Sequence, residues 1–547
     1  MRPSVLIQAH LRYLFLYRRT AVIIALATLL ISTMFANTVT AEDPSQAQIL
    51  ERLQQLENEQ KEMRELLKSK DARLNELEQE LQRVKQAASA GAAPAAKAVP
   101  PAAPVPSAPA GTTEGQLAAP APAPPIAPAA EPTPQLAAAP AAPSPSKEFF
   151  GRYVPGRGFT LAQTEWGEIV FSAYTYVRYL NQKGLDKTFT NGEGETTEVD
   201  RRNDFELNKV KLEFKGWFLD PRFQYVLYTW TNNTAMGLGS QVVVGGNLRY
   251  AFNDALQIGG GIFPLPSVRS NEGMWPYFLG VDHRTLTDEF FRGSYTMGIF
   301  AFGQLAPGLR YSTMLGDNLS ILGVDANQLD GRFQTVAAAL WWMPTTGEYG
   351  ERGGAFGDYE DHQELATRLG AHFTFSPEDA QQQPNTDAPD NSQIRLSNST
   401  VIFTPGALAP DVTINKVKYY MTSFDAGMKY HGFALEGQYF QRWLNDFHAN
   451  GELPIDHMND NGFELMASAM ALPKTLQLYT QGAYLFGEFG DPWEVTAGIN
   501  WWVFKRRELR LNLEYIYDRR SPVGYSAIPQ QVGGTGSIFN GNLELFF

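Results

Sequence analysis

The sequence predicts an all-β transmembrane barrel of about 16 antiparallel strands, preceded by a short α-helical coiled coil and a linker rich in alanine and proline. Hydrophobic residues make up 44% of the chain, yet after residue 41 there is no apolar run of the roughly 20 residues that a membrane helix needs. The carboxy-terminal part instead alternates apolar and polar residues with period two, as half-buried strands do. The chain ends on GNLELFF, and an apolar end must be held by structure.

The first 41 residues have the pattern of a cleaved secretory signal. Arg18 and Arg19 precede a single apolar run, and small residues lead up to Ala41. An uncleaved anchor helix is the alternative. An exported chain meets an oxidising compartment in which cysteines pair, and this chain has none. Its stability therefore depends on packing and hydrogen bonds rather than on disulfides.

Residues 44–86 carry a heptad repeat that predicts a coiled coil. Only Gln60 and Lys70 interrupt the apolar core positions, and the flanking charges match between parallel chains, so we expect a parallel homo-oligomer. The repeat alone does not separate a dimer from a trimer. The core positions are Ile49, Leu53, Leu56, Gln60, Met63, Leu67, Lys70, Leu74, Leu77, Leu81 and Val84.

Residues 87–146 form a linker in which alanine and proline dominate and aromatic residues are absent. Such a segment cannot build a core, and we expect an extended, semi-rigid spacer. A tether that binds the cell wall or a partner is the alternative interpretation.

Residues 147–547 contain the predicted barrel. In KVKLEFK, Val210, Leu212 and Phe214 share one face of a strand, and charged residues occupy the other. An even strand number places both ends of the barrel on one side, where most turns are tight. The stretch 343–365 is a long exception on that side. We expect strands near residues 165, 205, 221, 241, 255, 293, 308, 331, 365, 415, 432, 462, 474, 491, 507 and 536.

Tryptophans gather at predicted strand ends, as in the aromatic girdles of membrane barrels. We assign Trp217, Trp230, Trp341, Trp342, Trp443, Trp501 and Trp502 to these girdles. Closure requires the last strand to pair with the first, which turns Phe539, Leu543, Leu545 and Phe547 to the lipid.

The terminal Phe547 also resembles the signal by which outer-membrane barrels are recognised for assembly. It predicts the outer membrane of a Gram-negative bacterium, with the coiled coil in the periplasm. Outer-membrane lipid, lipopolysaccharide and the barrel assembly machinery are then the expected partners.

From about residue 150 to 547 the chain resembles the phosphate-selective porin O and P family. The resemblance is carried by LNKVKLEFKGWFLDPRFQYVLYTW, GGGIFPLPSVRSNEG, DEFFRGSYTMGIFAFGQL and GDYEDHQELATRLGAHFTFS. It implies a trimeric, sixteen-stranded channel whose third long loop folds into the lumen, and a coiled coil that would join the same homotrimer.

The resemblance also implies anion selectivity through basic residues in the lumen, a physically sound way to pass anions. Alternation turns one set of basic side chains to the wet face of their strands, and a second set lies in the expected third loop. The pore-lining candidates are Lys209, Lys211, Lys215, Arg249, Arg310, Arg368, His372 and Arg510, and the constriction-loop candidates are Arg269, Arg284 and Arg292.

The charge balance opposes strong anion selectivity. The net charge of −13 falls wholly on the barrel portion, and Glu213, Glu436, Glu494 and Glu514 are also predicted to face the lumen. In GGGIFPLPS an apolar residue stands where the family would have a basic one. We therefore expect passive diffusion of small hydrophilic solutes, to which the resemblance adds a preference for anions or phosphate. A structural tether anchored by the barrel is the alternative.

An enzyme is not predicted. The histidines after the signal are dispersed, and no serine lies in a nucleophile-elbow motif. With no cysteine and no histidine pair at ligand spacing, we predict no metal site and no cofactor. Nucleic acid is not an expected partner.

Overall fold

The computed structural model describes residues 151–547 except 191–193, 195, 233–240, 273–274, 321–332, 351–353, 381–393 and 526. The predicted signal (1–41), coiled coil (44–86) and linker (87–146) lie outside the described residues. Within the described part, no helix is long and apolar enough to span a membrane.

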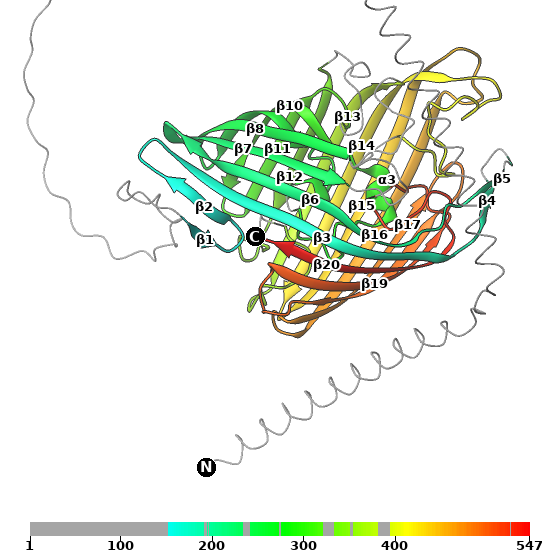
Figure 1. The fold of residues 1–547 in the computed structure, drawn as a ribbon. Helices are drawn as coiled ribbons and strands as arrows, with labels where there is room; N and C mark the ends of the chain where they lie inside the picture. The colour runs from blue at the N-terminus through cyan, green and yellow to red at the C-terminus, as the bar shows by residue number, and fades with distance from the viewer. Residues whose placement is uncertain are drawn as a thin grey trace, which may run out of the picture. The chain divides into compact units, whose positions relative to one another are not determined.

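Sixteen antiparallel strands form one closed barrel (Figure 1). They are β3 (Gly167–Leu185), β6 (Asn203–Phe218), β7 (Asp220–Asn232), β8 (Gln241–Asn253), β9 (Leu256–Pro264), β10 (Tyr295–Ala306), β11 (Leu309–Gly316), β12 (Thr335–Trp342), β13 (Ala366–Asp379), β14 (Ile414–Tyr430), β15 (Phe433–Ala449), β16 (His457–Leu472), β17 (Leu476–Phe486), β18 (Trp493–Trp501), β19 (Leu509–Arg519) and β20 (Gly536–Phe546). Every predicted strand has its counterpart, so the predicted barrel of about sixteen strands is confirmed.

The barrel closes between its last and first strands. β20 pairs with β3 from Gly536↔Leu185 to Phe546↔Tyr174, and the backbone of Phe547 exchanges two hydrogen bonds with Ala173. The Phe547 ring packs edge-on against Phe159 and Phe171. The last residue is therefore held in the wall, and no strand edge of the barrel is left open.

Two small hairpins accompany the barrel. β1 (Arg152–Val154) and β2 (Gly158–Gln163) pair with each other, and β2 also pairs with β3. The hairpin of β1 and β2 lies at the same end of the barrel as the carboxy terminus (Figure 1). β4 (Thr188–Thr190) and β5 (Thr196–Glu198) form a separate hairpin in the connection between β3 and β6.

The outer surface of the barrel is apolar. Side chains such as Leu227, Ile299, Phe424 and Leu465 are about half exposed, while their neighbours in sequence face inward. A closed sheet with an apolar exterior is the form in which strands cross a bilayer, since all backbone groups pair within it. The structure thus defines a transmembrane barrel.

The predicted aromatic girdle is only partly correct. Trp342, Trp443 and Trp501 face outward. Trp230 and Trp341 instead point into the barrel, and Trp502 is buried in a turn against Tyr359. Position at a strand end does not determine which face a residue occupies, because one step along a strand reverses it.

The connections divide into two sides. Phe547 and most tight turns lie on what we call the short-turn side, and the opposite end is the long-loop side. The third connection on the long-loop side, residues 265–294, contains η1 (Arg269–Asn271) and α3 (Leu286–Phe291), and its described residues are almost entirely buried. We call it the lumen loop. The exceptional connection 343–365 lies on the short-turn side as predicted, and its residues 354–359 are buried.

Candidate functional site: the lumen and its constriction

The lumen loop crosses the interior and is fixed to the wall by ionic and polar contacts. Arg269 donates to the Glu436 carboxylate on β15 at 2.5 Å and to the Gly354 carbonyl at 3.1 Å. Arg510 of β19 donates to the carbonyl of Phe278 at 2.8 Å and also pairs with Glu544 at 2.7 Å. The predicted folding of the third long loop into the lumen is present, and the connection 343–365 meets it there.

One half of the lumen is filled. The lumen loop packs α3 against β16, β17 and β18, and the connection 520–535 contributes further buried residues. We call the wall formed by β12–β20 together with β3 the filled half. Its inward ionisable side chains are nearly inaccessible to solvent. They include Arg178, Arg368, Lys429, Glu436, Arg442, Asp460, Glu464, Glu494, Arg510, Glu514 and Asp518.

Most basic groups of the filled half are held by acceptors within it. Arg442 pairs with Asp460 at 2.6 Å, with both side chains fully buried. Arg178 donates to the carbonyls of Ala527 and Val281. Lys429 donates to two backbone carbonyls of the short-turn connection. Charges engaged in this way bind the loops to the wall rather than a passing solute.

The other half of the lumen wall, β6–β11, stays open. We call it the open wall. Most of its inward charged side chains are only partly buried, whereas Lys209, Phe300 and Met314 are buried. Lys211 and Lys215 flank Glu213 at 2.6 and 3.0 Å. Arg249 donates to the Gln224 side-chain oxygen at 2.9 Å, and Arg310 has no acidic partner among the described residues. Basic residues outnumber acidic ones on this wall.

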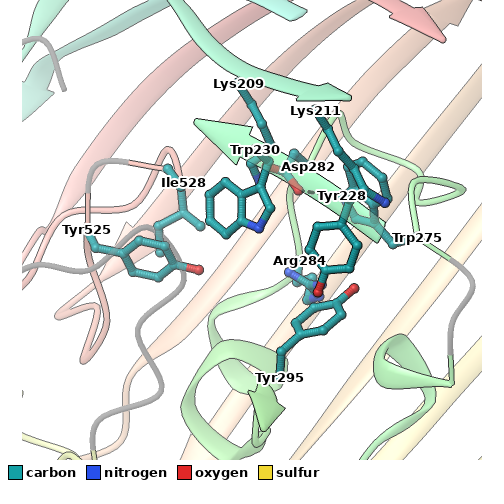
Figure 2. A pocket seen from close by; sticks show the side chains of 11 residues that line it. Lys209, Lys211, Tyr228, Trp230, Trp275, Asp282, Arg284, Tyr295, Tyr525 and Ile528 are labelled. Atoms are coloured by element: carbon teal, nitrogen blue, oxygen red, sulfur yellow. Dashed lines mark hydrogen bonds and ion pairs between the residues drawn. The ribbon is translucent and has the colours of Figure 1, made fainter. Parts of the chain in front are cut away.

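A cavity of ≈ 60 Å³ lies where the lumen loop faces the open wall (Figure 2). Lys209 and Lys211 enter from β6, Tyr228 and Trp230 from β7, and Arg284 from the lumen loop. Further lining comes from Trp275, Asp282, Tyr295, Tyr525, Ala527 and Ile528. It has room for several water molecules or a small solute, and it is the candidate constriction.

Aromatic faces and one carboxylate position the two lysines of the constriction. The Lys209 ammonium binds Asp282 and lies 4.8 Å from the centre of the Trp230 ring. The Lys211 ammonium lies 4.8 Å from the Trp275 ring. Burial alone would raise the pKa of Asp282, but the Lys209 ammonium outweighs it and holds that pKa below its usual value. Asp282 is therefore ionised and offsets one positive charge.

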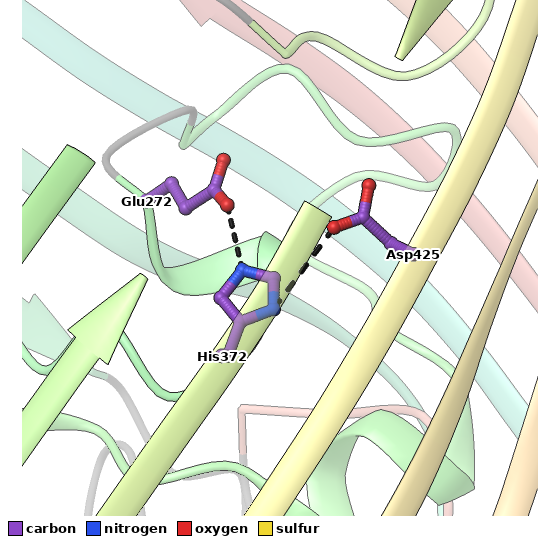
Figure 3. Close-up of side chains that lie close together, drawn as sticks. All are labelled: Glu272, His372 and Asp425. Atoms are coloured by element: carbon purple, nitrogen blue, oxygen red, sulfur yellow. Dashed lines mark hydrogen bonds and ion pairs between the residues drawn. The ribbon is translucent and has the colours of Figure 1, made fainter. Parts of the chain in front are cut away.

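Figure 3 shows the predicted residue His372 between Glu272 and Asp425. The predicted residue Arg368 joins the same buried cluster. His372 Nε2 lies 2.6 Å from Glu272 Oε1, and Ser423 contacts its other ring nitrogen. One histidine and two carboxylates have the composition of a metal centre, but Arg368 donates to Glu272 at 2.6 Å and to Asp425 at 2.7 Å. The guanidinium occupies the place that a metal cation would take, so the cluster is an ion-pair network.

The remaining loop candidates, Arg284 and Arg292, both contact Glu289 of α3. Arg284 lies 3.2 Å from this carboxylate and Arg292 lies 2.8 Å from it. Arg284 also lines the constriction, whereas Arg292 is buried and contacts the Tyr525 hydroxyl. The structure thus brings Lys209, Lys211 and Arg284 together. It distributes the other pore-lining candidates along the two walls and keeps Arg269 and Arg292 in the lumen loop.

The short-turn connection contains a second cluster, Asp358, Glu360 and His362. The hydrogen bond from His362 to Asp358 raises the pKa of this histidine, and Glu348 lies 2.9 Å from its other ring nitrogen. Asp358 also accepts the backbone N–H of Gly432 at 2.8 Å. Glu360 pairs with Arg507 at 2.6 Å. These contacts hold the connection at the mouth of the barrel.

Sequence reasoning missed several constriction residues. Trp275 and Asp282 lie in a loop without periodicity, and Tyr525 lies in a connection far along the chain. Trp230 was assigned to the membrane interface, although period-two alternation from Lys209 and Lys211 through the paired strand β7 offered a signal for its inward direction. Only the closed barrel brings these segments together.

No protein-family model and no curated protein matches this sequence. Solved structures with a similar fold include the anion-selective porin from Comamonas acidovorans, with 10% identity over 70% of this chain and 100% of that one and a TM-score of 0.43. The outer membrane channel DcaP of Acinetobacter baumannii has 8% identity over 72% and 100%, with a TM-score of 0.44. OmpT of Vibrio cholerae has 10% identity over 70% and 99%, with a TM-score of 0.43. The fold described above rests on the strand pairing of this chain.

Proposed function

We propose that the protein is an outer-membrane porin, a channel for passive diffusion of small hydrophilic solutes that prefers anions. The observation that carries this proposal is the unequal lumen. The filled half engages its charges in contacts with the loops, while the open wall presents Lys211, Lys215, Arg249 and Arg310 to solvent.

A solute that follows the open wall meets positive potential without meeting the acidic groups of the filled half. Glu213 offsets part of that potential, because it lies between Lys211 and Lys215. Charged side chains that line a narrow pore select ions by sign. The proposed preference is therefore moderate, and it persists although the chain as a whole is acidic.

A specific phosphate site is less well supported than a general anion preference. In the GGGIFPLPS segment, Phe263 stacks on Phe300 with ring centres 4.0 Å apart. An aromatic stack supplies no hydrogen-bond donors to the several oxygens of a phosphate. At the constriction, Lys209 is already paired with Asp282.

The test is the zero-current potential of the purified protein in a planar bilayer under a potassium chloride gradient, repeated with phosphate. We expect discrete conductance steps and a potential of the sign that anion selectivity gives, with weak block by phosphate. Block by submillimolar phosphate would support the specific phosphate site that the family resemblance implies. A folded barrel that conducts nothing would contradict the porin itself.

The proposal also includes the oligomeric state of the channel and the membrane that contains it. We infer a homotrimer in a Gram-negative outer membrane, with the coiled coil on the periplasmic side. Chemical cross-linking of the full-length protein and of a variant lacking residues 44–146 tests it. If both proteins form trimers, the contact between subunits lies in the barrel. If only the full-length protein forms trimers, the contact lies in the coiled coil. Loss of envelope integrity without loss of conductance would favour the tether instead.

A further inference from the structure

Two carboxylates face each other inside the barrel near its long-loop side. Glu494 of β18 lies directly opposite Asp518 of β19 in the strand register, and both side chains point inward. Their exposed fractions are 1% and 0%. Like charges placed opposite each other on neighbouring strands repel, and burial strengthens the repulsion.

The pair has acceptors in excess. Both carboxylate oxygens of Asp518 are buried and have no hydrogen-bond partner among the described residues. Glu494 accepts bonds from the Leu286 N–H at 3.0 Å, the Thr496 hydroxyl at 2.9 Å and the Gln530 amide at 2.8 Å. Gln530 is itself fully buried, and its side-chain oxygen also has no partner.

The surrounding charges do not neutralise the pair. His283 Nε2 lies 4.0 Å from Glu494, but its other ring nitrogen already contacts Glu514 at 3.0 Å. Glu464 and Asp288 are buried nearby and add further carboxylates. An isolated buried carboxylate is strongly unfavourable, so it is paired, protonated or bound to a metal.

A shared proton satisfies only part of this arrangement. One proton supplies one donor, whereas both buried oxygens of Asp518 need one. Gln530 faces Glu494 through its amide nitrogen, and its side-chain oxygen needs a further partner. Water supplies donors but no charge. A cation satisfies both requirements, because several oxygens can bind the same ion.

We propose that Glu494 and Asp518 bind a calcium ion inside the barrel, and that the Gln530 amide turns its unpartnered oxygen to the same ion. The available ligands are carboxylate and amide oxygens, which hard cations prefer and zinc does not require. Calcium accepts irregular geometry with mixed carboxylate and carbonyl ligands, whereas magnesium demands a regular octahedron. The sequence predicts no metal site, because ligands from distant strands leave no histidine or cysteine spacing.

The ion would join three segments of the lumen. Glu494 and Asp518 belong to neighbouring strands, Gln530 comes from the connection 520–535, and Glu494 holds the Leu286 N–H at the start of α3. Calcium would thus fasten α3 and this connection to the filled half. The inference does not depend on the ion selectivity proposed above.

Calcium binding is measured by isothermal titration of the full-length protein, refolded in detergent without lipopolysaccharide and stripped with a chelator. We expect one calcium ion per chain. Asp518→Asn should weaken binding at least tenfold. Asp456→Asn is the matched control, because its side chain is 95% exposed in a long-side connection, and it should leave binding unchanged.

Thermal unfolding gives a second readout, since an ion that binds only the folded state raises the unfolding temperature. We expect calcium chloride to raise it for the wild type and Asp456→Asn but not for Asp518→Asn. Glu494→Gln, which keeps an oxygen at the site, serves as a second variant if Asp518→Asn does not fold.

Absence of bound calcium in the folded wild type would overturn the inference. So would equal affinity in the wild type and the Asp518→Asn or Glu494→Gln variant. An Asp518→Asn protein that is more stable than the wild type and indifferent to calcium would assign the pair to a shared proton. Magnesium binding with equal affinity would overturn the choice of ion.

Discussion

The open wall and the filled half share the same period-two alternation of residues, but their inward charged residues have different roles. On β6, Lys211 and Lys215 are about one-fifth exposed and share one carboxylate. On β15, Arg442 follows the same period-two pattern but is completely buried with Asp460. The strands are alike, and the loops make the difference, because they cover one half of the lumen and leave the other accessible.

The comparison teaches that an inward basic residue is not by itself part of a permeation path. Arg368 and Arg510 face the lumen, yet their guanidinium groups bind Asp425 and Glu544 and are withdrawn from solvent. Their role is to fasten loops to the wall. The selectivity of the channel should therefore depend on a minority of its inward charges.

Removing the lumen loop should have the largest effect. Replacing residues 276–290 with a short glycine–serine linker removes α3 and opens the filled half. We expect single-channel conductance to rise several-fold. Shortening the connection 450–456, which is mostly exposed, is the control and should leave conductance near the wild-type value. Unchanged conductance after removal of the lumen loop would show that the loop does not narrow the path.

Breaking an ion pair of the filled half should act on stability rather than on selectivity. Arg442→Gln leaves Asp460 buried without its partner, and loss of one member of a buried pair costs about 3–5 kcal/mol. We expect a clear fall in the temperature at which the folded barrel unfolds in a gel-shift assay. Arg222→Gln, which breaks an exposed pair with Asp220, should change it little. A shift in ion selectivity for Arg442→Gln would contradict the distinction between the two halves.

Neutralising the open wall should act on selectivity rather than on stability. The double variant Lys211→Gln and Lys215→Gln leaves Glu213 without its two partners at the side of the path. We expect the anion-to-cation permeability ratio to fall by about two- to threefold, as a charged lining determines which ions pass. Lys505→Gln, at an exposed turn, is the control. An identical ratio in the double variant would place the path elsewhere.

The pH should have the smallest effect, through the short-turn connection. Because the folded pKa of His362 is raised above 6.5, its stabilising contribution is complete below that pH and is lost as the pH rises through the folded pKa. The folded pKa of Asp358 is lowered, even though burial opposes this, because of its hydrogen bonds with His362, and its contribution is lost only as the pH falls below about 3.8.

We therefore expect faster exchange of backbone amides in residues 354–362 at pH 8.5 than at pH 6, measured after correction for the intrinsic rate. His362→Gln should abolish the difference. Glu348 and Lys429 also face this histidine, and Glu348→Gln should reduce it. Equal protection at both pH values would assign the hold on the connection to contacts that do not depend on the charge of His362, such as those of Lys429 and the Glu360–Arg507 pair.

Much of the barrel was predictable from the sequence, because its signals are local. Alternation along each strand, tight turns such as LDP, and the terminal GNLELFF follow from a wall with one lipid face and one wet face. Even the long connection 343–365 was recognised as an exception on the short-turn side. These features depend on neighbours in the sequence, so one chain is sufficient to find them.

The candidate site was less predictable, since its geometry depends on where loops return. Nothing in the sequence near Arg368 shows that Glu272 will reach it, or that Asp282 will meet Lys209. Trp230 and Trp341 were assigned to the wrong face for the same reason: their partners belong to distant segments. Pairing of lumen charges is a property of the closed barrel.

The most direct measurement of the unequal lumen uses the absence of native cysteine. Single variants Lys211→Cys, on the open wall, and Gln481→Cys, whose side chain lies inside the filled half at 3% exposure, are treated with a water-soluble methanethiosulfonate while channel current is recorded. We predict rapid modification and a stepwise loss of current for Lys211→Cys, and protection for Gln481→Cys. Equal reactivity at both positions, or modification of Gln481→Cys alone, would contradict a path along β6–β11.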